Sequence, residues 1–237
     1  MIEKSDQQVS QGKYREGAEF LRKAIQLQAD SKQGAKAAYK LGFVQETYLS
    51  DPNSALFSYE EFIRLSKDPT SQYEVQKRIA DLYFEHVENL EKAITAYRRL
   101  MSLSPNSLES DSFQYRIANA YYRQNEFAQA RIEYESLIEK FPKSQFVIRS
   151  RYDVANTYFL ERHYDVGLEA FKQIARAYPQ SPQAVEAEFM MGLCLEQKQE
   201  LEAALRVYES VRVRYPAPTI VEMRIKSIQG RLGKKGK

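Results

Sequence analysis

The sequence has a single cysteine, Cys194, and two histidines, His86 and His163, among its 237 residues. One cysteine excludes an intramolecular disulfide, and no Cys or His lies at ligand spacing from either histidine, which argues against a zinc site. We therefore expect neither a metal nor another cofactor. Cys194 is expected to lie in a helix core.

Long hydrophobic runs are missing as well. The apolar stretches are far shorter than the roughly 18 to 20 residues that a membrane-spanning helix needs. The opening residues, MIEKSDQQ, have no apolar segment typical of a secretion signal. As written, the sequence predicts a cytoplasmic protein. If a signal was removed ahead of residue 1, the compartment would be the periplasm, and both alternatives stay open.

Positive charge is concentrated at one end of the sequence. The net charge is only +3, but nine Lys or Arg occur from Arg206 onward, against Glu209 and Glu222. This asymmetry favours an electrostatic contact through the basic C-terminus, although such tails are often only solubilising. Binding of nucleic acid or an anionic membrane there is the weaker alternative, because the rest of the chain has no basic stripe.

The sequence contains an internal repeat. The segment YRIANAYYRQNEFAQARIEYESLIEKFP, residues 115–142, aligns without a gap with YDVANTYFLERHYDVGLEAFKQIARAYP, residues 152–179, and its columns recur at steps of 37 or 38 residues. Small residues fill a first column at Gly42, Ala80, Ala118, Ala155 and Gly192. Small residues also fill a second column at Ala55, Ala93, Ala130, Gly167 and Ala204. Four residues after the second column stand the aromatics Tyr59, Tyr97, Tyr134, Phe171 and Tyr208.

Each repeat predicts a pair of helices. Within a repeat the apolar residues are three or four positions apart, as in Ala130, Tyr134 and Leu137, which is the period of an amphipathic helix. Small residues let two helices approach to about 8 Å, and an opposing aromatic fills the neighbouring space. Prolines are expected to end the second helices of the last four repeats, at Pro105, Pro142, Pro179 and Pro216.

The pattern resembles the tetratricopeptide repeat (TPR) family, whose repeat has Leu-Gly, Tyr, Ala, an aromatic and Pro at fixed offsets. Those offsets are occupied here by Leu41, Gly42, Tyr121, Ala130, Tyr134 and Pro142. The resemblance implies an all-α fold, a right-handed α-solenoid of about five TPR helix pairs with a leading half repeat and a C-terminal capping helix. The residues between the pairs also resemble the bacterial envelope-type subgroup, which includes the barrel-assembly lipoprotein and the Tol-Pal coordinator.

We predict one TPR solenoid over residues 1–237. Its parts are a partial first repeat at 14–30, repeats at 35–66, 73–105, 111–142, 148–179 and 185–216, a capping helix at 219–233 and a basic tail at 234–237. The residues before the first repeat offer only Ile2 and Val9 as useful apolar residues, so the first helix pair is half supported. This favours truncation of a longer protein at residue 1 over a poorly formed start of the array.

No group of side chains in the sequence suggests catalysis. His86 and His163 are expected in turns of different repeats, so we predict that the chain is not an enzyme. The resemblance instead implies a concave partner-binding groove lined by the first helix of each pair. Carried over residue by residue, its partner-binding positions are Tyr39, Lys77, Asp81, Tyr115, Asn119, Arg149, Tyr152, Asn156 and Phe189. Packing within the solenoid is the alternative role for the aromatic and amide residues among them.

The predicted function is that of an adaptor or scaffold that binds a peptide, helix or protein in this groove. The family variant that clamps a terminal carboxylate is disfavoured, because Tyr115, Asp153 and Glu186 stand where it needs basic residues. We expect a protein or peptide partner rather than a small-molecule substrate, and a monomer or weak dimer. Two alternatives stay open: an envelope-assembly factor of outer-membrane or Tol-Pal type, and a cytosolic scaffold for polarity or motility proteins.

Overall fold

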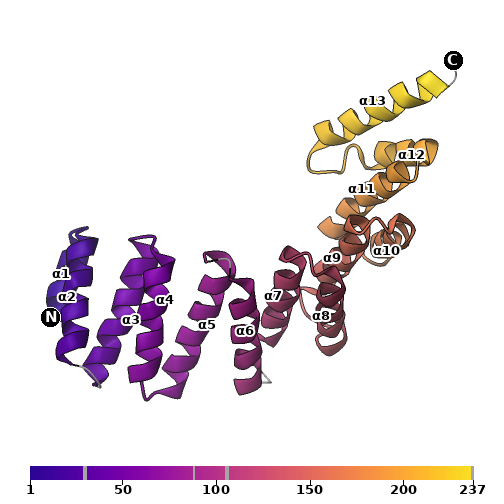
Figure 1. The fold of residues 1–237 in the computed structure, drawn as a ribbon. Coiled ribbons are helices and arrows are strands. Elements are labelled where there is room, and N and C mark those ends of the chain that lie inside the picture. The colour runs from indigo at the N-terminus through magenta and orange to yellow at the C-terminus, as the bar shows by residue number, and fades with distance from the viewer. Residues whose placement is uncertain (29–30, 88, 105–106, 236–237) are drawn as a thin grey trace. The chain divides into compact units, whose positions relative to one another are not determined.

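The computed structural model describes residues 1–28, 31–87, 89–104 and 107–235, and side chains as far as residue 233. Over these residues the chain forms thirteen α-helices and no strand (Figure 1), which confirms the predicted all-α fold. The helices divide into two compact units, Met1–Ala120 (unit 1) and Tyr121–Lys237 (unit 2), and the boundary falls inside the seventh helix. One continuous solenoid over the whole chain stays a prediction.

The helices follow one another in pairs. Those that begin in unit 1 are α1 (Ile2–Ser10), α2 (Tyr14–Leu27), α3 (Lys32–Thr47), α4 (Pro52–Leu65), α5 (Pro69–Glu85), α6 (Leu90–Leu103) and α7 (Ser110–Arg123). Those of unit 2 are α8 (Phe127–Lys140), α9 (Val147–Leu160), α10 (Tyr164–Ala177), α11 (Pro182–Gln197), α12 (Leu201–Val211) and α13 (Pro218–Lys235). Each of the five repeat spans predicted from the sequence holds two consecutive helices.

Several first helices begin earlier than the repeat columns indicated, because their N-terminal caps lie upstream of the columns. α3 begins directly after Ser31, whose hydroxyl accepts a hydrogen bond from the N–H of Gly34 at 3.0 Å. α5 begins directly after Asp68, whose carboxylate accepts one from the N–H of Ser71 at 3.1 Å. α11 begins after Ser181 in the same way. Such caps stabilise a helix start by about 1 kcal/mol, and a proline in the first turn of α5 and α11 adds to them.

The prolines end two of the second helices as predicted. α8 and α10 each end two residues before the proline, at Lys140 and Ala177. α12 is an exception, because it ends at Val211, well ahead of Pro216. The carbonyl of Val211 there accepts hydrogen bonds from the third and fourth N–H groups after it, at 3.0 and 2.9 Å, so the chain leaves the helix in a tight turn. Pro105 lies outside the described residues.

The predicted columns form the core of both units. Twelve of these side chains are fully buried: Ala55, Tyr59, Ala80, Ala93, Tyr97, Ala118, Ala130, Tyr134, Ala155, Phe171, Ala204 and Tyr208. Each buried aromatic removes about 150–250 Å² of surface from water, which makes these rings a main source of stability.

Two of the small–aromatic pairs are so close that only glycine fits between the helices. A Cβ atom on Gly42 would lie 2.6 Å from Cδ1 of Tyr59, and one on Gly192 would lie 2.5 Å from Cε1 of Tyr208. Gly167 is different, because a Cβ there would meet its nearest atoms at 3.5 Å, an ordinary contact distance. The predicted pairing of small and aromatic residues is therefore confirmed, and it is tightest at Gly42 and Gly192.

The N-terminal repeat has both of its helices, which corrects the predicted half repeat to a complete pair. α1 packs closely on α2, since a Cβ on Gly17 would lie only 2.7 Å from Cγ2 of Val9. Ser5 is buried by this approach although it is polar. A helix that lies against a glycine needs few large apolar side chains to cover its partner, and this is why the sequence pattern of α1 is weak.

α13 covers the last helix pair, as the capping-helix prediction required. Three residues bury its inner side against α11 and α12: Val221, Ile225 and Ile228. α13 continues through Lys235, two residues beyond the predicted end of the capping helix at residue 233. Residues 236–237 lie outside the described part of the chain.

Within the described residues, five turns inside the helix pairs share a residue with left-handed backbone conformation. The positive φ angles occur at Gly12, Ser50, Asn125, Arg162 and Gln199. These positions recur at the step of the repeat, so the turn geometry is a property of the repeat. Glycine adopts this conformation without steric cost, whereas other L-residues lose about 1–2 kcal/mol there.

We expect Arg162→Gly to raise the free energy of unfolding of unit 2 by up to about 1 kcal/mol, because glycine adopts the φ of 64° without strain. The opposing cost is the greater conformational entropy that glycine gives to the unfolded chain. Thermal unfolding followed by circular dichroism measures the change. Asn125→Gly is the matched control and should gain less, since asparagine tolerates this conformation. A lower melting temperature for Arg162→Gly would contradict the assigned strain.

Candidate partner-binding site

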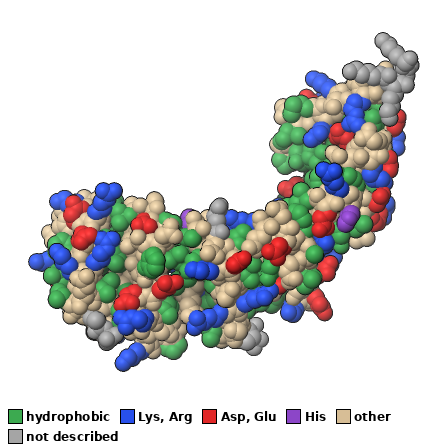
Figure 2. Space-filling model, in the orientation of Figure 1, with side chains coloured by type: hydrophobic (Ala, Val, Ile, Leu, Met, Phe, Trp, Pro, Cys, Tyr) green, Lys and Arg blue, Asp and Glu red, His purple; other side chains and the backbone are tan. Residues whose placement is uncertain are grey.

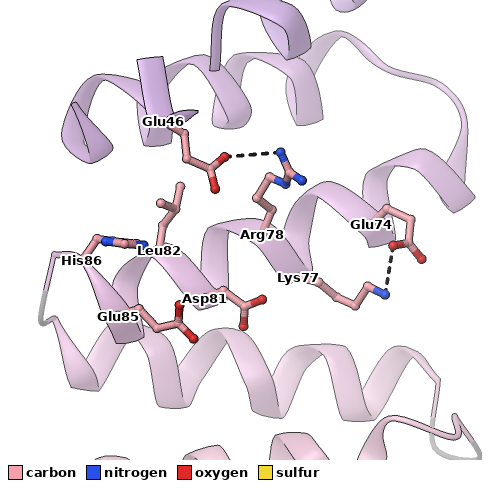
Figure 3. Close-up of a pocket in the computed structure, with 8 residues that line it drawn as sticks. All are labelled: Glu46, Glu74, Lys77, Arg78, Asp81, Leu82, Glu85 and His86. Atoms are coloured by element: carbon pink, nitrogen blue, oxygen red, sulfur yellow. Dashed lines mark hydrogen bonds and ion pairs between the residues drawn. The ribbon is translucent and has the colours of Figure 1, made fainter. Parts of the chain in front are cut away.

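The first helices of unit 1 enclose a pocket along α5, which we call the α5 pocket. It has a volume of about 310 Å³ and lies between α5 and the end of α3 (Figure 3). Its lining residues are Glu46, Glu74, Lys77, Arg78, Asp81, Leu82, Glu85 and His86. Two residues of the predicted groove, Lys77 and Asp81, are therefore brought together in one hollow.

The charged side chains of the α5 pocket are held by ion pairs. Lys77 Nζ lies 2.9 Å from Glu74 Oε2 and 3.0 Å from Glu109 Oε1. Arg78 Nη1 lies 3.3 Å from Glu46 Oε2, on the far side of the pocket (Figure 3). Partial burial acts to lower the pKa of Lys77, but its hydrogen bonds to Glu74 and Glu109 outweigh burial and raise this pKa above its ordinary value. Lys77 is thus a fixed positive charge.

A buried tyrosine, Tyr97, orients one carboxylate of the α5 pocket. The Tyr97 hydroxyl donates a hydrogen bond to Asp81 Oδ1 at 2.6 Å. Arg116 Nη1 lies 3.5 Å from the same oxygen and 2.8 Å from Glu85 Oε1. Burial raises the pKa of Tyr97 above its ordinary value, so its hydroxyl stays protonated and able to donate. The side chain of Asp81 therefore has a fixed orientation in the α5 pocket.

The same arrangement occurs one helix pair earlier. The Tyr59 hydroxyl donates to Glu46 Oε2 at 2.5 Å and accepts a hydrogen bond from Arg78 Nη1 at 3.2 Å. Arg78 and Arg116 each come 19 residues after the tyrosine that they contact. In unit 2 the same repeat column holds Asp153 and Met190, so this arginine column is confined to the first part of the chain.

A larger pocket lies between the first turns of α3 and α5, also within unit 1. It has a volume of about 1160 Å³, and we call it the lysine pocket after Lys32, Lys36 and Lys67 at its rim. Tyr39 of the predicted groove lines it, with 37% of the residue exposed and its ring 5.8 Å from that of Phe62.

Sequence reasoning missed Lys32 and Lys67 of the lysine pocket. The first-helix columns begin after Lys32, and Lys67 belongs to the loop that precedes α5. The available signal was the stretch SKDPTS, residues 66–71, in which a lysine directly precedes a helix cap.

The predicted positions on α7 are half-buried. Tyr115 and Asn119 lie one helical turn apart, and both already interact with other residues of the protein. A partner would have to share or displace these interactions.

In unit 2 the predicted positions on α9 are engaged with their neighbours. Arg149 Nε donates to Asp153 Oδ1 at 3.1 Å, and the Arg149 guanidinium lies 5.2 Å from the ring centre of Tyr152. Asn156 Nδ2 donates to the Tyr122 hydroxyl at 2.7 Å. Burial, followed by the charge of the nearby Glu186, raises the pKa of Tyr152. α9 thus presents these groups in a packed, hydrogen-bonded layer.

Phe189 is a core residue, which corrects its assignment to the groove. It is only 7% exposed, its ring stacks on Tyr215 at 4.4 Å, and it lies 5.5 Å from Tyr208. Tyr215 comes from the segment between α12 and α13, whose path the repeat columns do not specify. We therefore remove Phe189 from the binding positions.

The basic C-terminal end has much of its charge neutralised within unit 2. The ion pairs join Arg212 to Glu222, Arg214 to Glu188, and both Arg224 and Arg231 to Glu196. Figure 2 shows acidic side chains interspersed with basic ones on the visible surface of this unit. A contact made through this end would have fewer free charges than the sequence count suggests, and the side chains of Lys234 and Lys235 lie outside the described ones.

Of the residues that could carry chemistry, His86 lines the α5 pocket, whereas Cys194 and His163 line neither pocket. Cys194 is fully buried, as predicted, and burial raises the pKa of its thiol to about 12, so it is a poor nucleophile. His163 is exposed at the start of α10. Over the described residues, no three His, Cys, Asp or Glu side chains gather in a way that could hold a metal ion. No helix in the described part of the chain is long and apolar enough to cross a membrane.

Two family profiles match the sequence, and both are described as tetratricopeptide repeat. One covers residues 112–144, which correspond to most of α7, α8 and the loop that follows. The other covers residues 152–217, from within α9 to the segment after α12. No curated protein matches the chain at a significant level.

Solved structures of helical-repeat proteins resemble the chain in fold. A MamA protein gives a TM-score of 0.57 at 15% identity over 78% of this chain and 93% of its own. MamA from Desulfovibrio magneticus RS-1 gives 0.55 at 17% identity over 75% and 92%. A tetratricopeptide repeat protein from Parabacteroides merdae gives 0.54 at 18% identity over 96% and 97%. At these identities the likeness concerns the fold alone.

Proposed function

The chain belongs to the tetratricopeptide repeat family, and on that basis we propose that it is a non-enzymatic scaffold whose first-helix face binds a segment of a partner protein. Stacked helix pairs present extended surfaces that suit a polypeptide ligand. The proposal places the binding face on α3 and α5 in unit 1, and extends it to Tyr115 and Asn119 of α7. In unit 2, taken by itself, the proposed binding residues are Arg149, Tyr152 and Asn156 of α9.

One observation carries this proposal. The two pockets of unit 1 adjoin along α5, since Glu74 lines both, and the predicted residues Tyr39, Lys77 and Asp81 are distributed between them. An exposed tyrosine offers a large contact area at low conformational cost. Ion-paired charges that are already fixed can orient a ligand without further loss of side-chain entropy. The combination suits a peptide segment with mixed apolar and polar side chains.

A photo-crosslinking experiment tests the proposal in the cell that makes the protein. A photoreactive phenylalanine analogue in place of Tyr39 is expected to give discrete adducts of higher mass on irradiation, because its ring lies in the proposed site. Mass spectrometry of the adducts identifies the partner.

Phe57 provides the matched control, since it is an aromatic residue of the same unit, is 73% exposed, and lies on the second helix α4. The same analogue at Phe57 should give no such adducts. Equal adducts at both positions, or none at Tyr39, would refute binding at the first-helix face.

A further inference from the structure

The lysine pocket differs from the α5 pocket in the state of its charges. Lys32 and Lys36 come from the first turns of α3, and Lys67 comes from the loop between α4 and α5. Within the described part of the chain, none of these three ammonium groups forms an ion pair. In the α5 pocket, by contrast, both Lys77 and Arg78 are paired.

Two carboxylates line the lysine pocket, and Lys32 acts electrostatically on one of them, Asp68. Asp68 accepts hydrogen bonds from the Ser71 hydroxyl and from the Ser71 N–H, the latter at 3.1 Å, and these bonds lower the pKa of Asp68. Glu74 Oε2 lies 2.9 Å from Lys77 Nζ. The three rim lysines outnumber the two carboxylates, so the formal charge of the residues that line the pocket is +1.

The floor of the lysine pocket is apolar. Its apolar residues are Ala35, Tyr39, Phe62, Leu65 and Val75. With about 1160 Å³ of open volume, the pocket has room for a bulky side chain together with the backbone on either side of it. An occupant that filled it would bury apolar surface below and meet three ammonium groups at the rim.

We propose, resting on the function proposed above, that the lysine pocket binds an acidic peptide segment in which one apolar side chain is flanked by carboxylates. The apolar side chain packs against Tyr39 and Phe62, and the flanking carboxylates lie among the rim lysines. Burial of the apolar side chain supplies affinity, and the charges supply specificity and faster association.

Nucleic acid fits this surface less well than an acidic peptide does. The lysines form one cluster rather than a stripe, and a long polyanion that continued along α5 would meet Glu46, Asp81 and Glu85 of the adjoining pocket. A short peptide segment can place its carboxylates at the rim without passing these acidic residues.

A binding assay with defined probes tests this proposal on the full chain. The probe is a fluorescein-labelled synthetic peptide in which a single phenylalanine has two glutamates on each side, followed by fluorescence anisotropy. The triple variant Lys32→Glu, Lys36→Glu, Lys67→Glu is expected to weaken binding about tenfold or more, since three favourable charge contacts become repulsive. The triple variant Lys4→Glu, Lys13→Glu, Lys23→Glu changes net charge equally on α1, α2 and the turn between them, and should bind like the unmodified protein.

Two further probes separate the apolar and the electrostatic contributions to peptide binding. Replacement of the peptide's phenylalanine by serine should also weaken binding about tenfold, because the pocket floor is then unfilled. A labelled oligothymidylate of similar charge should bind more weakly than the peptide. The proposal is overturned if the unmodified chain does not bind the peptide, if both triple variants lose affinity equally, or if the oligothymidylate binds more tightly.

The assay and the crosslinking experiment can fail separately. If Tyr39 crosslinks to a partner but the acidic peptide does not bind, the scaffold function stands and the assigned ligand chemistry is wrong. If Tyr39 gives no adduct while Phe57 does, the binding face itself is wrong.

Discussion

Replacement of Tyr97 by alanine is expected to lower the free energy of unfolding of unit 1 by about 3–5 kcal/mol, the range for loss of a buried aromatic side chain. Tyr97 is fully buried and its ring lies 5.7 Å from that of Phe113. Its hydroxyl also donates to Asp81 at 2.6 Å. The substitution removes both the ring packing between neighbouring helix pairs and the group that orients a carboxylate of the α5 pocket.

Hydrogen exchange monitored by mass spectrometry is the suitable measurement, because repeat proteins can unfold locally. Peptides from α5 and α6 should lose protection in Tyr97→Ala. Tyr97→Phe keeps the ring and should cost only about 1 kcal/mol, the net value of one hydrogen bond. Phe57→Ala, at an exposed position, should leave protection unchanged. Equal loss in Tyr97→Phe and Tyr97→Ala would show that the hydroxyl, not the ring, stabilises this region.

Replacement of Gly192 by alanine is expected to destabilise α11 by about 2 kcal/mol, because overpacking costs about 1–3 kcal/mol and exceeds the gain in helix propensity. The new methyl group would overlap the Tyr208 ring, whose hydroxyl donates to Glu196 at 3.2 Å and so resists displacement. Alanine does occupy this column in other repeats, at Ala80, Ala118 and Ala155. At residue 192, an alanine would fit only if α11 and α12 moved apart.

The reactivity of the Cys194 thiol toward a disulfide reagent measures this effect directly. Cys194 lies on the same helix and is fully buried, so it reacts only when α11 opens. Gly192→Ala should speed the reaction at least about tenfold. Gly167→Ala is the matched control and should slow it slightly, because its methyl group would lie at an ordinary 3.7 Å from the Cys194 sulfur and favours the helix. Equal rates in the two variants would contradict the assigned close contact at Gly192.

The helix pairs and the core could be predicted from the sequence because both follow from periodicity. Burial of Tyr59, Tyr97 and Tyr134 follows from a spacing of three and four residues in a column repeated five times. α1 could not be predicted with the same strength. Its contact with α2 depends on close approach at Gly17, and close approach is a property of backbone distance that an apolar count does not reveal.

The candidate site could be predicted only as far as the face of the helix on which residues lie. The repeat register directed attention to Tyr39, Lys77 and Asp81, which line the two pockets of unit 1. It could not show that Tyr215 covers Phe189, because that tyrosine comes from a segment outside the register. The repeat register also could not show which charges are paired, because Lys77 pairs with Glu109, which lies 32 residues away in the sequence.

The burial of Cys194 also has a practical consequence. A cysteine introduced at an exposed position would be the one readily alkylated thiol of the native protein, because the sequence has no other cysteine and the native one is shielded. Fluorophores or spin labels could therefore be attached at chosen sites on either unit without first removing the natural residue.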